Sequence, residues 1–266
     1  MVDGSATEDL LYEVRDGIAR VTFNRPQARN AMLFGMYERL AEICAEVEAD
    51  RSIRALILTG AGEKAFAAGT DISQFRAFET PEDALGYEAR IDRVLGVLER
   101  VRVPTIAAIA GACTGGGAAM AACCDLRIAA GNMRFGFPIA RTLGNCLSLS
   151  NYARLAALVG PARVKDMVFT ARLVEAEEAR AIGLVSEVLP DPAALAVRAE
   201  ELARLVAANA PLTLRATKEA LRRIKERSLA PGDADKDLLL MCYMSADFRE
   251  GMDAFLGKRL PIWRGE

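Results

Sequence analysis

The 266-residue sequence predicts an α/β protein whose strands pair largely in parallel. The first half of the chain alternates short apolar runs with longer segments of helical period. Two of the apolar runs end in glycine-rich turns that lead into a further helix. From about residue 193 the chain is helical and highly charged, so we expect a core over residues 1–192 and a helical region over residues 193–266.

The first elements are a hairpin, a helix and a buried strand. Residues 10–15 and 18–24 are short β-rich runs, and Asp16-Gly17 between them is a hairpin turn signal. Apolar side chains recur at helical spacing over residues 35–50, at Met36, Leu40, Ile43, Cys44 and Val47. Residues 53–59 form a continuous apolar run, which predicts a strand buried on both faces.

The middle of the chain repeats this order. Residues 81–102 predict a helix with one apolar stripe, made of Ala84, Tyr87, Ile91, Val94, Leu95 and Leu98. Residues 104–109 and 126–130 predict two more buried strands. Beyond Cys146 the pattern is mainly helical, apart from residues 183–190.

Composition excludes several classes of function. The net charge is −2 and no block of Lys or Arg occurs, so we expect no nucleic-acid partner, and an RNA-binding role has little support. The chain has no histidine and its six cysteines form no C-x-x-C pair, which argues against a metal site and a disulfide framework. The first ten residues lack the pattern of a signal peptide, so we expect a reduced, cytoplasmic protein.

Residues 103–124 carry no charge and are long enough to span a bilayer. Pro104, Gly111 and the run Gly115-Gly116-Gly117 divide this stretch, however. We therefore expect a strand, a tight turn and a buried helix here, and no membrane segment.

Two glycine loops, residues 65–72 and 111–119, share one plan. Each follows an apolar strand and leads into a helix N-terminus, where backbone N–H groups lack partners. Two such N–H groups directed at one point form an oxyanion hole, although close backbone packing is the alternative for either loop alone. A dinucleotide motif would need a third glycine where Met120 stands, and no Gly-Lys-Ser/Thr follows for a P-loop.

Several segments together resemble one known family. They are Asn24-Arg25-Pro26 with Asn30-Ala31-Met32, LTGAGEKAFAAGTDI at residues 58–72, GACTGGGAAMAACCDLRIA at residues 111–129, and the C-terminal APLTLRATKEAL, SADFREGMDAFLGKR and PIWRG. In this order they resemble the enoyl-CoA hydratase/isomerase, or crotonase, family from about residue 13 to the end.

The resemblance implies a crotonase-like spiral of ββα units, with a C-terminal helical region that associates into homotrimers or hexamers. It implies an acyl-CoA thioester as substrate, with coenzyme A as part of that substrate and no prosthetic group. The oxyanion donors would be the backbone N–H groups of Thr70, where the family usually has alanine, and Gly116. The coenzyme A channel would be lined by Arg25, Ala28, Ala65, Ala67, Ala68, Gly69, Asp71 and Ile72. Phe255 and Lys258 match a terminal F-x-x-K that reaches coenzyme A, while a solvated charge is the alternative for Lys258.

The two glutamates that family hydratases use are absent. Ala119 stands at the first position and Ile139 at the second, and the only acid between Gly117 and Lys165 is Asp125. Water addition needs a base and an acid, which alanine and isoleucine cannot supply. A two-glutamate hydratase mechanism and a one-glutamate isomerase are therefore not supported, and the absence of histidine excludes a histidine-assisted dehalogenase.

Other residues could supply the missing chemistry. Candidate bases follow the first glycine loop: Asp71, Glu79, Glu82, Asp83, Glu88 and Asp92. Exposure or helix capping is the alternative for each, and Asp71 in particular is placed as a helix N-cap. Polar groups also replace an apolar wall of the family at Arg141, Asn145, Cys146, Ser148 and Ser150.

Arg141 could bind a negative group on the acyl chain or activate water, against the alternative of a structural ion pair. Cys146 is a poor candidate nucleophile because no base can be identified for it. The sequence thus leaves two functions open: an enzyme acting on an acyl-CoA through an enolate, and a non-catalytic acyl-CoA-binding paralogue.

Overall fold

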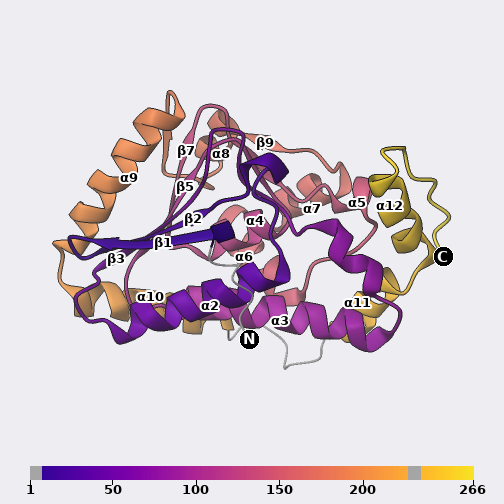
Figure 1. Cartoon of the computed structure of the whole chain (residues 1–266), viewed down its shortest axis with the longest axis horizontal. Coiled ribbons are helices and arrows are strands. Elements are labelled where there is room, and N and C mark those ends of the chain that lie inside the picture. Colours follow the sequence, from indigo (N-terminus) through magenta and orange to yellow (C-terminus); the bar gives the residue numbers. More distant parts are fainter. Residues whose placement is uncertain (1–7, 227–234) are drawn as a thin grey trace.

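The computed structural model describes residues 8–226 and 235–266, which form two β-sheets and the helices around them (Figure 1). The strands are β1 (Leu10–Arg15), β2 (Ile18–Phe23), β3 (Ala55–Gly60), β4 (Ala65–Ala68), β5 (Thr105–Ile109), β6 (Ala112–Thr114), β7 (Leu126–Ala130), β8 (Arg134–Gly136), β9 (Val174–Glu175) and β10 (Glu187–Leu189). The helices are η1 (Pro26–Ala28), α2 (Phe34–Ala49), η2 (Ile72–Ala77), α3 (Pro81–Arg100), α4 (Gly116–Cys123), α5 (Ile139–Thr142), α6 (Leu149–Val159), α7 (Pro161–Phe169), α8 (Ala176–Ala181), α9 (Pro192–Ala207), α10 (Pro211–Glu226), α11 (Lys236–Tyr243) and α12 (Ala246–Leu256).

The predicted parallel α/β class is confirmed by the strand order. The larger sheet runs β1-β2-β3-β5-β7-β10 and the smaller one β4-β6-β8-β9. Neighbouring strands are parallel except in the pairs β1–β2 and β8–β9. The pairs β3/β4, β5/β6 and β7/β8 each give one strand to each sheet before a helix follows, which is the repeated ββα unit that the resemblance implied.

The predicted hairpin, helices and buried strands are confirmed with small changes at their ends. Asp16 and Gly17 both have positive φ, as a tight hairpin turn between β1 and β2 requires. The two glycine loops, however, are not loops throughout, because their first residues form β4 and β6. The sequence concealed these strands because each is very short and pairs only with strands far along the chain.

The central strands of the larger sheet are buried on both faces, and their side chains alternate between two clusters. In β3, Leu56 and Leu58 join the main core with α2 and α3. Ala55 and Ile57 face the other way and belong to a second cluster with Leu195 and other residues of α9. Figure 1 shows α9 along one end of the molecule and α12 with the C-terminus at the opposite end. The boundary predicted at residue 193 therefore falls just after Pro192, at the start of a helix that packs on the core sheet.

The uncharged stretch of residues 103–124 forms the expected strand β5 and helix α4, with the short strand β6 between them where a turn was predicted. Within residues 8–226 and 235–266, none of the helices has the length and apolar character needed to cross a membrane.

Candidate functional site

The two glycine turns lie side by side because β4 and β6 are parallel neighbours. Ala68 pairs with Thr114, and the turns follow at Gly69 and Gly115, with φ of +93° and +51°. A Cβ added to Gly115 would lie 3.4 Å from the Cα of Gly69. Positive φ therefore favours glycine at both turns, and the two backbones lie within van der Waals contact of each other.

Two backbone N–H groups emerge from these turns. Met32 donates to the carbonyl of Gly69 and accepts from the N–H of Asp71, both at 2.8 Å. The N–H of Thr70 between them points away from Met32, because successive residues of an extended chain face opposite sides. Gly116 is the first residue of α4, so its N–H has no acceptor within its own helix.

Two tyrosines hold the side chain of Thr70. Its Oγ1 lies 2.9 Å from the hydroxyl of Tyr37 and 3.0 Å from that of Tyr87. Burial raises the pKa of both tyrosines, so both stay neutral at physiological pH. A Cβ on Gly116 would lie 2.1 Å from the Tyr37 hydroxyl, so the same tyrosine also limits what can stand at Gly116.

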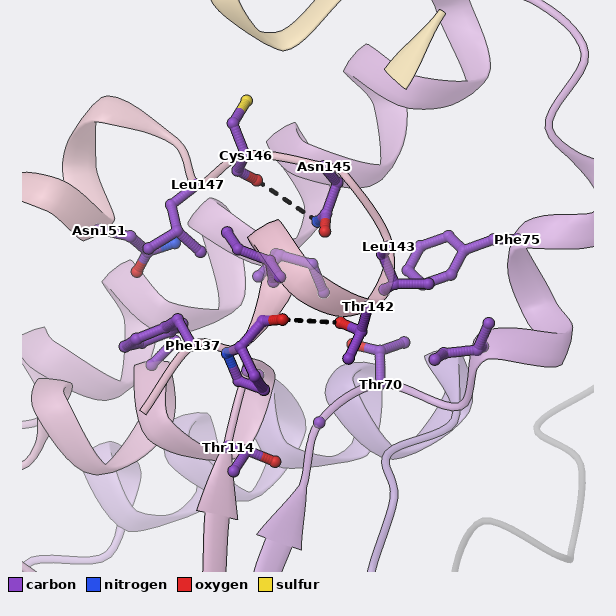
Figure 2. Close-up of a pocket in the computed structure, with 18 of the residues that line it drawn as sticks. Thr70, Phe75, Thr114, Phe137, Thr142, Leu143, Asn145, Cys146, Leu147 and Asn151 are labelled. Atoms are coloured by element: carbon purple, nitrogen blue, oxygen red, sulfur yellow. Dashed lines mark hydrogen bonds between the residues drawn. The ribbon is translucent and has the colours of Figure 1, made fainter. Parts of the chain in front are cut away.

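Both turns open into a cavity of about 160 Å³ (Figure 2). Its wall also includes residues of η2, α3, α5, α11 and α12. Much of the wall is apolar, from Phe75, Ile91, Phe137, Ile139, Leu143 and Leu147. An apolar cavity of about this size holds a benzene molecule, so the space suits a small organic group.

The two positions that the resemblance assigns to hydratase glutamates both lie in this wall. Ala119 and Ile139 line the cavity and are 4% and 7% exposed. The cavity therefore has no carboxylate at either of these two positions.

Another carboxylate is present. Of the described residues that line the cavity, only Glu88 of α3 carries a carboxyl group, and it is 6% exposed. Tyr243 of α11 donates a hydrogen bond to Glu88 Oε1, and Asn145 Nδ2 lies 3.2 Å from the Tyr243 hydroxyl. Burial raises the pKa of Glu88 to about 8, and Asp92 and Asp235 add to this while the hydrogen bond from Tyr243 opposes it. Such a group can both accept and release a proton near neutral pH.

Asp71 is a helix cap, as predicted. Its carboxylate accepts from the N–H and the hydroxyl of Ser73 at the start of η2, and Arg25 pairs with it at 3.2 Å. Burial alone would raise the pKa of Asp71, but the hydrogen bonds from Ser73 and Arg25 outweigh it and hold this pKa below its usual range. Arg25 also donates to the carbonyl of Ala31 at 2.6 Å, so the pair ties the segment before α2 to η2.

The remaining candidate bases lie elsewhere. Glu79 and Glu82 are exposed, and Asp83 is in the capping box of Thr80 at the start of α3. Asp92 accepts from the hydroxyls of Ser148 at 2.8 Å and Ser150 at 3.1 Å. None of these four carboxylates is in the described wall of the cavity.

The residues expected around coenzyme A fall into two groups. Ala68, Gly69, Ile72 and Phe255 line the cavity. The others lie outside its described wall: Arg25 and Asp71 in their ion pair, Ala28 in η1, Ala65 and Ala67 buried in β4, and Lys258 exposed just after α12. Their contacts with coenzyme A remain predictions.

Arg141 is exposed on α5 and does not belong to the described wall of the cavity. Cys146 does line it, but its thiol pKa is raised, first by its hydrogen bond with Cys242 and then by burial. A raised pKa keeps the thiol protonated and does not favour a nucleophile.

Sequence reasoning missed Tyr243, because nothing in the local sequence links it to Glu88, 155 positions away. Glu88 itself has a signal in the local sequence. It lies four residues after Ala84 and three before Ile91, so it falls on the apolar stripe of the predicted helix.

Comparison with known proteins agrees with this architecture. The family model described as enoyl-CoA hydratase/isomerase matches residues 13–266. The short-chain-enoyl-CoA hydratase of Clostridium acetobutylicum is 36% identical over 254 residues, which cover 94% of this chain and 95% of the relative.

Two solved structures are also similar over nearly their whole length. An enoyl-CoA hydratase/carnithine racemase from Magnetospirillum magneticum is 34% identical, with a TM-score of 0.78, and the match covers 97% of this chain and 96% of the other. A methylmalonyl-CoA decarboxylase in complex with 2-nitronate-propionyl-CoA is 28% identical, with a TM-score of 0.87 and coverage of 97% and 98%.

Proposed function

Because this chain belongs to the enoyl-CoA hydratase/isomerase family of acyl-CoA-processing enzymes, we propose that its cavity holds the acyl end of a CoA thioester and stabilises the enolate. The thioester oxygen would lie between the N–H groups of Thr70 and Gly116. These donors leave adjacent parallel strands, and neither is used by the Met32 bridge or by α4. Donors fixed in this way stabilise the charged oxygen of an enolate more than the neutral carbonyl.

Glu88 is the acid/base group of this proposal, and its burial in the cavity wall is the observation that carries it. As a carboxylate it removes a proton from the α-carbon of the thioester, and the electron pair moves to the carbonyl oxygen. The reverse step returns the proton to the α-carbon. With the pKa of Glu88 at about 8, both steps are accessible near neutral pH.

The coenzyme A portion would leave the cavity past Ala68 and Ile72. We place the pantetheine and nucleotide along the backbone around Arg25, Ala28, Ala65 and Ala67. Phe255, half-exposed at the cavity wall, supports a role for the end of α12 in binding. Lys258 follows it as a cation for the phosphates of coenzyme A.

The proposal includes self-association into trimers or hexamers. None of the 16 residues of α10 is buried, and Leu221 and Ile224 on one of its faces are 63% and 62% exposed. An exposed apolar helix face of this kind supports an interface at α10, and we take its partner to be another copy of this chain.

Proton exchange at the α-carbon tests the enzyme proposal without requiring that the overall reaction be known. Butyryl-CoA incubated with the protein in D₂O should gain deuterium, measured by mass spectrometry. Glu88→Gln should slow this exchange by at least about 100-fold, because a positioned acid or base contributes on that scale. Glu82→Gln removes an exposed carboxylate from the same helix and should leave the rate unchanged.

Two other outcomes would change the conclusion. Tight binding of butyryl-CoA without any exchange would favour the non-catalytic acyl-CoA-binding paralogue. Equal exchange by the wild-type protein and Glu88→Gln would remove Glu88 from the mechanism. The exchange assay does not decide whether water addition is the overall reaction. Incubation with crotonyl-CoA decides this, because hydration removes the absorbance of the enoyl thioester.

A further inference from the structure

One buried atom of the cavity has no partner. Among the described residues, Asn145 Oδ1 is the buried side-chain nitrogen or oxygen that makes no hydrogen bond. Asn145 lines the cavity, and Figure 2 shows its amide pointing from the backbone toward the other residues of the wall. Buried polar atoms are nearly always paired, so an orphan in a cavity wall points to a group that the ligand brings.

The orientation of this amide follows from its neighbours. Asn145 Nδ2 faces two oxygens, the Tyr243 hydroxyl at 3.2 Å and the carbonyl of Cys146 at 3.4 Å. A carbonyl oxygen only accepts hydrogen bonds, so the atom facing it is the amide nitrogen. The unpartnered atom is then an acceptor, and the missing group is a donor.

The surroundings restrict that donor to a neutral one. The described wall contains no Lys or Arg, and its one carboxyl group, Glu88, has a pKa raised to about 8 and is largely protonated at neutral pH, so neither an anionic nor a cationic acyl group would meet a fixed counter-ion. Phe75, Leu143 and Leu147 contribute apolar side chains to the same wall, and an apolar surrounding penalises charge of either sign. A hydroxyl group fits both conditions.

We propose that Asn145 Oδ1 accepts a hydrogen bond from a hydroxyl group on the acyl chain, so that the cavity selects short hydroxyacyl-CoA thioesters over thioesters without the hydroxyl. This inference rests on the proposed function, since it assumes that the acyl group occupies the cavity. The Tyr243 hydroxyl bonds both Asn145 and Glu88, so the bound hydroxyl lies in the same polar cluster as the acid/base group. The cavity of about 160 Å³ limits the acyl group to a few carbons.

Calorimetric titration with matched ligands tests the inference. The ligands are butyryl-CoA, both enantiomers of 3-hydroxybutyryl-CoA, and 4-hydroxybutyryl-CoA, each checked by mass spectrometry for conversion after the titration. At least one hydroxyacyl ligand should bind about tenfold more tightly than butyryl-CoA, because a good hydrogen bond contributes on that scale. Asn145→Leu should bring this ratio close to one while butyryl-CoA still binds.

Two further variants check that the loss of the ratio comes from the missing acceptor. Asn145→Ala removes the same acceptor without adding bulk, so it should lose the ratio even if the leucine disturbs the fold. Thr142→Val removes another polar group of the wall, but that hydroxyl already donates to the carbonyl of Pro138 at 3.0 Å. Its ratio should therefore match that of the wild-type protein.

Each other outcome overturns the inference. If the wild-type protein binds all the ligands equally, the hydroxyl subsite is wrong and the proposed function stands. The same holds if Asn145→Leu slows crotonyl-CoA hydration without any hydroxyl preference in binding, because the donor is then a water molecule. If butyryl-CoA and the hydroxyacyl ligands all fail to bind, the subsite and the proposed function both fall.

Discussion

Glu88 has an unusual place for an acidic residue, on the apolar stripe of α3 between Ala84 and Ile91. Burial there disfavours its charged form, and this is the largest cause of its raised pKa. Tyr243 acts in the opposite direction, because a hydrogen bond donated to a carboxyl favours the charged form. The pKa near 8 is the balance of these two effects, with Asp92 and Asp235 adding to the rise.

Tyr243→Phe tests this balance. Removing the donated hydrogen bond should raise the pKa of Glu88 further, so the pH at which α-proton exchange reaches half its maximal rate should move above the wild-type value near 8. Tyr12→Phe removes a hydroxyl on β1 and should leave this midpoint in place. An unchanged midpoint in Tyr243→Phe would mean that the group titrating in the exchange assay is not Glu88.

The same pKa predicts a pH-dependent stability. The pKa of Glu88 rises from about 4.5 to about 8 on folding. Its contribution to the free energy of unfolding is therefore fully present below pH 4.5 and is lost as the pH rises through 8. The free energy of unfolding of the wild-type protein should therefore fall relative to that of Glu88→Gln between pH 5 and 9, with a slope of about 1.4 kcal/mol per pH unit between the two pKa values. Urea unfolding at several pH values measures it, and a constant difference would contradict the raised pKa.

Gly116 is the other residue whose replacement has a clear expected effect. Gly116→Ala places a methyl group 2.1 Å from the present position of the Tyr37 hydroxyl, so the tyrosine or the start of α4 must move. We expect a loss of exchange activity on the order of 100-fold, as for one lost oxyanion donor. Gly86→Ala adds the same methyl group in open space on α3 and should keep full activity. Equal activities would show that α4 tolerates the shift.

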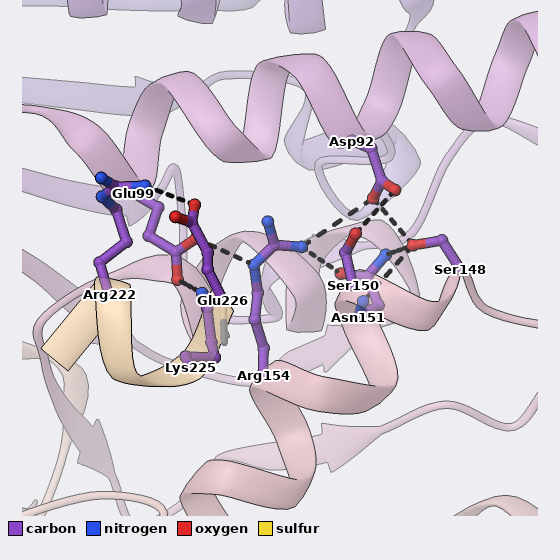
Figure 3. A network of polar contacts seen from close by, with 9 residues as sticks. All are labelled: Asp92, Glu99, Ser148, Ser150, Asn151, Arg154, Arg222, Lys225 and Glu226. Carbon is purple, nitrogen blue, oxygen red and sulfur yellow. Dashed lines mark hydrogen bonds and ion pairs between the residues drawn. The ribbon is translucent and has the colours of Figure 1, made fainter. Parts of the chain in front are cut away.

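At the scale of whole elements, an ionic network joins α3, α6 and α10 (Figure 3). Arg154 of α6, 7% exposed, contacts Asn151 at 3.2 Å and Glu99 at 3.4 Å, and lies 3.9 Å from Asp92. Lys225 of α10 pairs with the same Glu99. Asn151 also lines the cavity, so the network holds in place one residue of the cavity wall.

Arg154→Leu should destabilise the protein by about 2 kcal/mol, because it removes a buried guanidinium from the partly buried carboxylates of Asp92 and Glu99. Glu99 keeps its pair with Lys225. Arg172→Leu is the matched control, since Arg172 pairs with Glu178 and Asp166 at the surface and an exposed pair contributes about 1 kcal/mol or less. Urea unfolding at one fixed protein concentration measures both variants. Similar losses in the two would mean that burial of the Arg154 network adds nothing.

At the scale of the whole molecule, α10 leaves an apolar face uncovered. Leu221 and Ile224 lie about one turn apart and share that face. Leu212, nine residues before Leu221, points to the opposite side of the helix. A single chain thus exposes an apolar stripe that association with further copies would bury.

The double variant Leu221→Glu/Ile224→Glu should reduce a trimer or hexamer to smaller species, because charge at a buried interface is costly. Leu212→Glu adds one charge to the opposite side of α10 and should leave the assembly intact. Size-exclusion chromatography with light scattering gives the mass of each species. A wild-type protein that is monomeric at micromolar concentration would contradict self-association.

The sequence by itself determined the α/β class, the approximate bounds of the hairpin, α2, α3 and the strands β3, β5 and β7, and the two glycine turns. These follow from hydrophobic period and from the backbone freedom of glycine, which are local properties of the chain. It also predicted, from the resemblance, that Ala119 and Ile139 stand where family hydratases carry glutamates. The role of Asp71 as a helix cap also follows from the local sequence.

Only the tertiary structure decided which of six candidate carboxylates enters the cavity, and that Arg141 stays outside its described wall. Short strands such as β4 and β6 were hidden for the same reason, because their pairing is not local. The polar cluster of Glu88, Tyr243 and Asn145 joins three distant segments. Burial, a raised pKa and an unpartnered acceptor arise only when packing removes those groups from water, and a linear sequence does not encode that proximity in any local pattern.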